Sequence, residues 1–107
     1  MSKIPSDEIL DRMESVLNIA SDFTRLKIMY AIMKEEKSVS EIVEEVGASQ
    51  SLVSHQLSVL KNADLVSTRK DGTKVFYRLA DEHVDMLLKI VYEHVSEKEK
   101  LWKKRNP

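Results

Sequence analysis

Four side chains near the C-terminal end of the sequence have the types and the spacing of a metal site. Asp81 and His83 are two residues apart, and farther along the chain His94 and Glu97 are three residues apart. His83 and His94 are separated by eleven residues, which returns an α-helix to within about 20° of the same face. Imidazole and carboxylate groups are zinc ligands, so the pattern predicts a helix face with candidate ligands at both ends.

These four groups cannot bind one ion within a single helix. Eleven residues of helix span roughly 16 Å, whereas a zinc–ligand bond is about 2 Å long. An antiparallel second copy of the helix would bring His94 and Glu97 beside the other copy's Asp81 and His83, and two-fold symmetry would then create two identical sites. Asp81 fits this arrangement only if it lies at the capping start of the helix.

The four groups together would complete a tetrahedral shell around zinc, with no position left for a catalytic water. Cobalt would be accepted in place of zinc, nickel tends to require more ligands, and soft ions prefer thiolates. The sequence therefore favours Zn(II) as a regulatory ligand, with Co(II) as a substitute.

A second group of polar side chains has the character of a DNA-reading surface. Residues 48–60 contain no Lys, Arg, Asp or Glu, and residues 61–78 carry five basic and two acidic side chains. The chain therefore has local positive potential for a polyanion although its net charge is −1. Gln can bond adenine through two hydrogen bonds, and Ser can bond bases or phosphates. The candidate DNA contacts are Ser49, Gln50, Ser51, Ser54, His55, Gln56, Arg69, Lys70, Thr73 and Lys74.

The composition limits the class of protein. A chain of 107 residues with 42% hydrophobic and 33% charged residues is expected to form one small globular domain that dimerisation would stabilise. The absence of cysteine excludes disulfides, thiolate ligands and a thiol nucleophile. No apolar run is long enough for a membrane span, and the N-terminus has no signal-peptide core. We therefore expect a cytoplasmic protein.

Caps and apolar spacing indicate the elements that position these groups. Helices are predicted from Ser6, from Asp22, from Ser38 to Gly47, from Ser49 or Gln50, and from Asp81 to about residue 101. The buried stripe of the fourth helix should consist of Leu52, Val53, Leu57 and Leu60. Residues 66–70 and 73–79 are predicted strands around Asp71-Gly72, which favours a type I′ turn with positive φ at both residues.

This order of elements is typical of a winged helix-turn-helix, a mainly α fold with one β-hairpin (α+β). We expect a single domain over residues 1–107. Within it, residues 38–63 would form the helix-turn-helix and residues 66–79 the wing. Residues 6–20 and 81–101 would be the dimerisation helices, and residues 102–107 a flexible tail, unless the basic end of the chain from Lys98 extends the last helix.

Several stretches resemble the ArsR–SmtB family of metal-sensing bacterial repressors, over about residues 8 to 97. They are Asp22-Phe23-Thr24-Arg25-Leu26-Lys27-Ile28, the run from Ser49 to Leu60, Asp64-Leu65-Val66 and Val75-Phe76-Tyr77-Arg78-Leu79. The resemblance implies a homodimer whose fourth helices enter successive major grooves of a palindromic, double-stranded operator. It also implies a ligand that weakens DNA binding and switches on genes for metal efflux or sequestration.

The pattern Asp-x-His-x10-His-x2-Glu resembles the final-helix site of the family's zinc sensors at Asp81, His83, His94 and Glu97. In those sensors the histidine at the position of His94 uses its second ring nitrogen, the one that is not on the metal, to bond a backbone carbonyl near the end of the recognition helix. By resemblance, that carbonyl corresponds to about Asp64. One feature departs from the family. Many relatives have Cys-Val-Cys where this chain has Ser38-Val39-Ser40, so sensing of thiophilic metals is not expected, and Ser38 is better interpreted as a helix cap.

Other interpretations remain open at this point. The same fold could respond to Ni(II) or Co(II), or to a non-metal effector, or it could hold zinc as a purely structural link between two copies. His55 is interpreted as a DNA contact or a polar surface residue rather than a ligand. An enzyme is not expected, because there is no open metal position and no Gly-rich or nucleophile motif, and neither a membrane nor a small-molecule substrate is expected as a partner.

Overall fold

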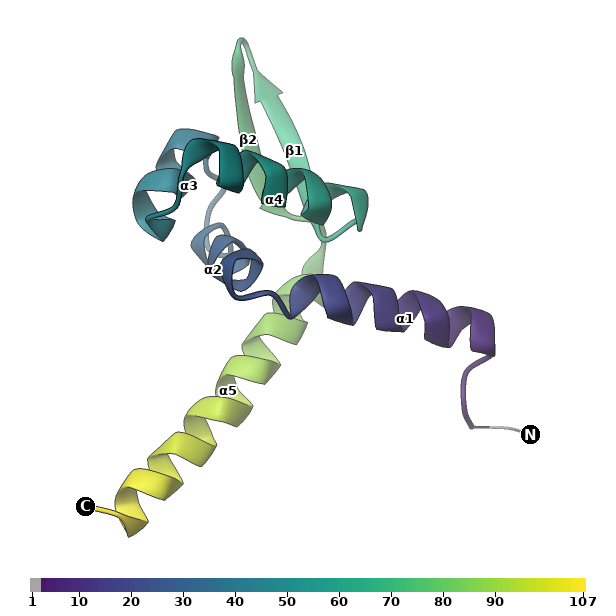
Figure 1. Cartoon of the computed structure of the whole chain (residues 1–107), viewed down its shortest axis with the longest axis vertical. Helices are drawn as coiled ribbons and strands as arrows, with labels where there is room; N and C mark the ends of the chain where they lie inside the picture. The colour runs from purple at the N-terminus through teal and green to yellow at the C-terminus, as the bar shows by residue number, and fades with distance from the viewer. Residues whose placement is uncertain (1–2) are drawn as a thin grey trace.

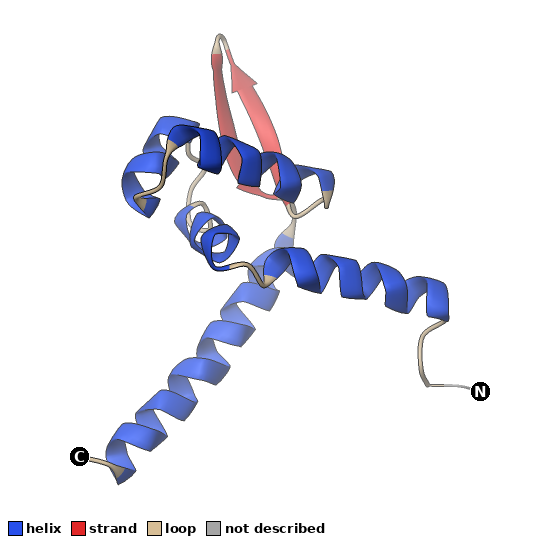
Figure 2. Cartoon of the chain, in the orientation of Figure 1, coloured by secondary structure: helices blue, strands red, loops and turns tan. Residues whose placement is uncertain are grey.

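The computed structural model describes residues 3–107, which form helices and one two-stranded antiparallel sheet (Figure 1). In chain order the elements are α1 (Asp7–Ala20), α2 (Phe23–Ala31), α3 (Val39–Val46), α4 (Gln50–Asn62), β1 (Val66–Asp71), β2 (Lys74–Leu79) and α5 (Glu82–Arg105). Helices α2, α3 and α4 gather beside the hairpin, whereas α1 and α5 project away from them in different directions (Figure 2). This is the winged helix-turn-helix that the sequence predicts.

Each helix begins at a side chain that caps it. The side chains of Ser6, Asp22, Ser38, Ser49 and Asp81 accept a hydrogen bond from the backbone N–H three residues later. At Ser38 the cap is reciprocal, because Glu41 also accepts the backbone N–H of Ser38. These caps satisfy N–H groups that a helix leaves unpaired, and the helix starts predicted from the sequence are confirmed.

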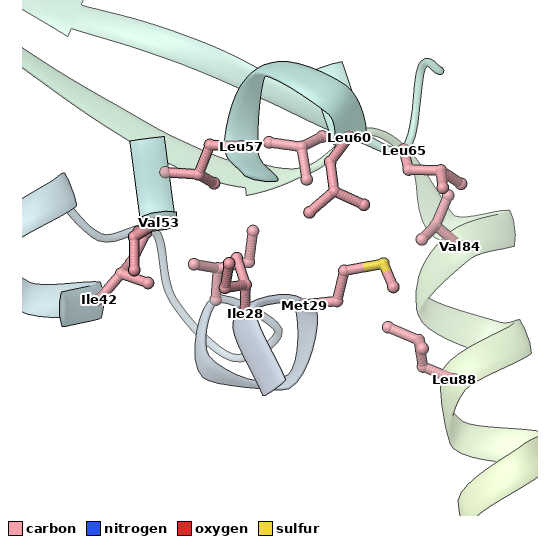
Figure 3. Packing of buried hydrophobic residues seen from close by; sticks show 11 residues of the cluster. Ile28, Met29, Ile42, Val53, Leu57, Leu60, Leu65, Val84 and Leu88 are labelled. Carbon is pink, nitrogen blue, oxygen red and sulfur yellow. The ribbon is translucent and has the colours of Figure 1, made fainter. Parts of the chain in front are cut away.

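The core lies where α2, α3 and α4 meet the base of the hairpin and the first turns of α5 (Figure 3). Ile28 and Met29 of α2 are fully buried at its centre, against residues of α4. The buried stripe of α4 is Val53, Leu57 and Leu60. Leu52 was expected to belong to this stripe but is 40% exposed, because adjacent positions on a helix point about 100° apart and Val53 faces the core.

The hairpin pairs Val66 with Leu79 at its base and Asp71 with Lys74 at its tip. The two residues between the last pair are therefore Gly72 and Thr73, and Gly72 has a φ of 64°. Asp71 belongs to β1 and is not in the positive-φ region. The predicted type I′ turn centred on Asp71-Gly72 is therefore wrong, because the turn lies one residue farther along the chain.

Lys37 attaches the wing to the helices. Its backbone N–H donates to the carbonyl of Tyr77 at 3.0 Å, and its carbonyl accepts from the N–H of Tyr77 at 2.8 Å. Its ammonium group donates to the carbonyl of Ala31 and lies 3.0 Å from a carboxylate oxygen of Glu45. One residue thus connects β2 to the end of α2 and to α3.

The two projecting helices bury little. No residue of α1 is buried, and α5 buries Val84 and Leu88 in its first half. Helix α5 continues to Arg105, which corrects the expectation of a flexible tail over residues 102–107: the segment up to Arg105 is helical, and Trp102 lies on it with 64% of its surface exposed. Among the described residues, no helix has the length and apolar character needed to cross a membrane.

Candidate nucleic-acid interface and metal site

Helix α4 is amphipathic in the way a DNA-reading helix requires. Its buried face packs into the core, and its other side presents exposed side chains without charge, including Gln50, Ser51, Ser54 and His55. The turn before it contains Gly47, whose φ of 75° lies in the left-handed region that glycine adopts without strain. The structure therefore places four of the predicted DNA contacts together on one accessible surface that begins at the Ser49 cap.

Gln56 differs from these neighbours. Its side chain is half-buried, and its Oε1 accepts a hydrogen bond from Nη1 of Arg25 at 2.7 Å. A guanidinium has donors but no acceptor, so the amide oxygen must face Arg25. The bond from Arg25 occupies one of the two lone pairs of the amide oxygen, the atom that the predicted two-bond contact to adenine would also use.

The wing carries its predicted basic residues on the surface, but one of them is already paired. Nε of Arg69 donates to Oε1 of Glu36 at 2.8 Å, and its guanidinium lies 4.9 Å from the ring centre of Phe76. The hydrogen bond from Arg69 lowers the pKa of Glu36 and in turn raises that of Arg69. Lys70, Thr73 and Lys74 are also exposed. Because Arg69 is already bonded to Glu36, these three side chains are the better candidates in the wing for donating hydrogen bonds to a ligand.

The first pair of predicted metal ligands lies at the start of α5. Asp81 is the N-cap, and its Oδ1 accepts the N–H of Val84 at 3.1 Å. Nδ1 of His83 is 3.7 Å from the same oxygen, and 91% of the His83 side chain is exposed. The capping position brings Asp81 to the side of His83, as a shared ion would require.

The second pair lies farther along α5. His94 and Glu97 are exposed and one helical turn apart, so both can reach one ion. They cannot reach the first pair within the chain, since eleven helical residues span roughly 16 Å. Within residues 3–107, no three potential ligands come together at one place. The donor types and the pairing fit zinc, and the missing half of each site would have to come from a second copy.

Apolar side chains surround these ligands on the exposed face of α5. Ile90 is 59% exposed, and Met86, Val91 and Val95 are also exposed. Helix α1 likewise exposes Ile9, Met13 and Leu17. Contiguous apolar surface on a small protein marks an interaction site, so both projecting helices have the character of an uncovered interface.

Two side chains of α2 have contacts that were not predicted from the sequence. Arg25 bonds Gln56 and also the carbonyl of Ile19. Tyr30 donates from its hydroxyl to the carbonyl of Leu88 at 2.7 Å, and burial together with Tyr92 raises the pKa of that hydroxyl. A signal for Arg25 exists in the sequence: it lies three and four residues before Ile28 and Met29, which places a charge on the buried face of α2.

The sequence of the chain is similar to known families and proteins. Residues 22–68 match the family model described as "Bacterial regulatory protein, arsR family". The chain is 40% identical over 85 residues to the HTH-type transcriptional regulator KmtR of Mycobacterium tuberculosis, a match that covers 79% of this chain but 65% of KmtR. It is 37% identical over 83 residues to a cadmium resistance transcriptional regulatory protein CadC homolog of Staphylococcus aureus, covering 77% of this chain and 69% of the relative.

A solved structure has the same architecture. The homodimeric winged helix-turn-helix DNA-binding domain of Mb0332 from Mycobacterium bovis superposes with a TM-score of 0.82 and 28% sequence identity, over 92% of this chain and 94% of that chain. The two relatives are named as transcriptional regulators, and the Mycobacterium bovis structure as a DNA-binding domain. The expectation of a non-enzymatic protein is confirmed at the level of family and fold.

Proposed function

Because the chain belongs to the ArsR family of bacterial regulatory proteins, we propose that it is a homodimeric transcriptional repressor whose operator binding is weakened by Zn(II). The protein would bind a palindromic operator through α4 and the wing, and zinc would bind between the α5 helices of the two copies. The regulated genes would be those for metal efflux or sequestration.

The observation that carries the DNA-binding part is the uncharged, exposed face of α4. Gln50, Ser51, Ser54 and His55 are short or planar hydrogen-bonding groups on a helix whose opposite face is fixed in the core. Such a helix fits the major groove, where its side chains can reach base edges. The exposed wing groups Lys70, Thr73 and Lys74 would contact the flanking phosphates, which position the protein without reading sequence.

The exposed apolar faces of α1 and α5 support the homodimer. A two-fold interface uses the same surface on both copies, and an antiparallel pair of α5 helices would cover Ile90 and Val91 on each copy. The homodimeric state of the Mycobacterium bovis domain agrees with this proposal. Two recognition helices related by a two-fold axis require a palindromic operator.

The same antiparallel pairing supports the metal part. It would bring His94 and Glu97 of one copy to Asp81 and His83 of the other, giving two closed tetrahedral sites. Each bound zinc would supply a bridge between the two α5 helices and disfavour the protomer spacing that the operator requires. Ligand imidazoles must be neutral to bind the metal, so metal binding should weaken on acidification.

His94 would also transmit the binding event. Its second ring nitrogen would bond a backbone carbonyl near Asp64, the residue that follows the end of α4 with a φ of 59°. Hydrogen bonds from a ligand to the backbone orient the ligand and connect it to its surroundings. In this proposal the connection runs from the metal to the C-terminal end of the DNA-reading helix.

The decisive experiment measures DNA binding by fluorescence anisotropy, on a duplex from upstream of the protein's own gene, with and without one zinc equivalent per protomer. We expect zinc to weaken binding at least tenfold, about 1.4 kcal/mol of coupling, and a chelator to restore it. The coupling is reciprocal, so the duplex should weaken zinc binding by the same factor.

Three other results would change the conclusion in different ways. Tight DNA binding that ignores zinc but responds to Ni(II), Co(II) or a small molecule would keep the repressor and replace the effector. Zinc that strengthens the dimer without changing DNA affinity would make the metal structural. No binding to any duplex would contradict the proposed function itself.

A further inference from the structure

Two side chains of α2 connect the body of the protein, which consists of α2, α3, α4 and the hairpin, to the projecting helices α1 and α5. Nε of Arg25 donates to the carbonyl of Ile19 at 2.6 Å, in the last turn of α1, while Nη1 donates to Gln56 in the middle of α4. Five residues farther along α2, the hydroxyl of Tyr30 donates to the carbonyl of Leu88 in α5. Helix α2 is therefore hydrogen-bonded through its side chains to α1, α4 and α5.

These ties matter because the projecting helices are otherwise held by few contacts. Helix α1 has no buried residue and meets the core through the half-buried Val16, Ile19 and Ala20. Helix α5 is held through Val84 and Leu88 near its start. Apolar packing is not directional, so a short apolar contact leaves a helix free to pivot, whereas a guanidinium with bonds to two helices constrains direction.

A small pivot at these joints has a large effect at the far end. Helix α1 contains 14 residues and is therefore about 21 Å long. A rotation of about 10° about its attached end moves the other end by about 4 Å, close to the rise of about 3.4 Å for one base pair. In a dimer formed through these helices, the angle between the body and the projecting helices would therefore influence the separation of the two DNA-reading helices on the scale of a base pair.

We propose that Arg25 and Tyr30 are positioning residues that set this angle and thereby select the spacing of the operator half-sites. The inference rests on the proposed function, since it requires a dimer formed through α1 and α5. Neither residue touches DNA in this scheme: Arg25 acts through Gln56 and Ile19, and Tyr30 acts through Leu88. Half-site spacing is a geometric property of a helix-turn-helix dimer, so its determinants must lie in the connection between the DNA-reading and dimer-forming elements.

The test uses duplexes built from the two operator halves, with the central spacer shortened or lengthened by one and two base pairs. We expect the wild type to bind the preferred spacing at least tenfold more tightly than its neighbours. The variants Arg25→Met and Tyr30→Phe remove the hydrogen bonds and keep most of the side-chain volume. Each should weaken binding at the preferred spacing but not at the neighbouring ones, so that the preference falls to threefold or less.

A core variant, Ile42→Val, is the matched control. Ile42 is fully buried and makes none of these hydrogen bonds, so its loss of a methyl group should weaken binding, if at all, by one factor at every spacing. If Arg25→Met proves unstable by thermal unfolding, Gln56→Met breaks the tie from the α4 side while leaving the bond to Ile19 available, and should also broaden the profile.

The possible failures are distinguishable. Variants that weaken all spacings by a common factor, as the core control does, would overturn the positioning role and leave the repressor intact. A wild type that binds a single half-site as tightly as the complete operator would instead contradict the dimeric operator complex on which both proposals depend.

Discussion

The helix-turn-helix body and the two projecting helices differ in how much of their apolar surface the chain itself covers. In the body, Ile28 and Met29 are fully buried among residues of the neighbouring helices and the hairpin. On α5, by contrast, Ile90 is exposed and so are the candidate ligands on either side of it. The proposed DNA-reading surface is therefore complete within one chain, whereas the proposed metal site and the proposed apolar seam would each need a second chain.

Substitutions in the two regions should consequently be detected by different measurements. The largest expected effect is on folding: Ile28→Ala should lower the free energy of unfolding by about 2–5 kcal/mol, because it leaves a cavity in the packed core. Urea unfolding followed by circular dichroism measures this loss. An exposed apolar position on the same helix, Phe23→Ala, serves as the control and should change stability far less. Equal losses at the two positions would contradict the burial described for α2.

The opposite behaviour is expected on α5. Ile90→Glu should raise the dimer dissociation constant at least a hundredfold, about 2.7 kcal/mol, because two like charges would meet across an apolar seam. Analytical ultracentrifugation measures the dissociation constant, and the far-UV spectrum of the body should not change. Glu93→Gln, on the same exposed helix, is a charge-changing control. A variant that stays dimeric would show that the seam lies elsewhere.

Substitution of one residue, His94, should abolish the response to zinc without changing DNA binding. His94→Ala should keep the operator affinity of the metal-free protein and lose the zinc-induced weakening of at least tenfold, about 1.4 kcal/mol. Anisotropy titrations with and without zinc, on the same duplex, measure both quantities. His55→Ala should do the reverse, with weaker DNA binding and a preserved zinc response. A His94 variant that still releases the operator on zinc addition would rule out the proposed relay.

Removal of one helix cap in the body should have a smaller effect on stability than a cavity in the core. Ser49→Ala removes the acceptor for the N–H of Leu52 at the start of α4 and should cost about 0.5–2 kcal/mol of stability. Ser49→Asn keeps an acceptor and is the control. Thermal unfolding measures the difference. A loss in both variants would mean that the hydroxyl has a role besides capping.

The smallest expected effect concerns the wing. Glu36→Gln should strengthen DNA binding about two- to threefold, because it frees the guanidinium of Arg69 to approach phosphate. The hydrogen bond from Arg69 lowers the pKa of Glu36 in the folded protein. The ion pair therefore stabilises the fold at any pH above the pKa that Glu36 has in the unfolded chain, and this stabilisation is lost as the pH falls through the lower pKa of the folded protein. Anisotropy near neutral pH measures the gain. Unchanged affinity would mean that Arg69 points away from DNA.

Local features explain why so much of the fold could be predicted. The caps at Ser38 and Asp81 satisfy N–H groups only three residues away, and Gly47 ends α3 through its own backbone preference, so each signal is contained in a short window of sequence. The turn at Gly72 shows the limit of such signals. Asp-Gly indicates a tight turn, but the strand register, which places Asp71 opposite Lys74, decides which residues form it.

The site was less predictable where partners are distant in sequence. Gln56 and Arg69 have the types of DNA contacts, but their hydrogen bonds come from Arg25 and Glu36, which are 31 and 33 residues away. The spacing of residues along a helix or strand cannot predict a hydrogen bond between side chains so far apart in the sequence. The end of α5 was left open between a flexible tail and a longer helix. Glu99 and Lys103 form an i, i+4 ion pair at 3.2 Å, and this spacing was available in the sequence as support for the longer helix.

The exposed end of α5 also gives the protein a built-in optical label. The chain contains one tryptophan, Trp102, on the part of α5 that extends beyond the body. Indole emission from unlabelled protein therefore reports the polarity around this helix end alone, without interference from the DNA-reading half. A blue shift on concentrating the protein, or on adding metal, would follow events at the end of α5 in real time and without a chemical tag.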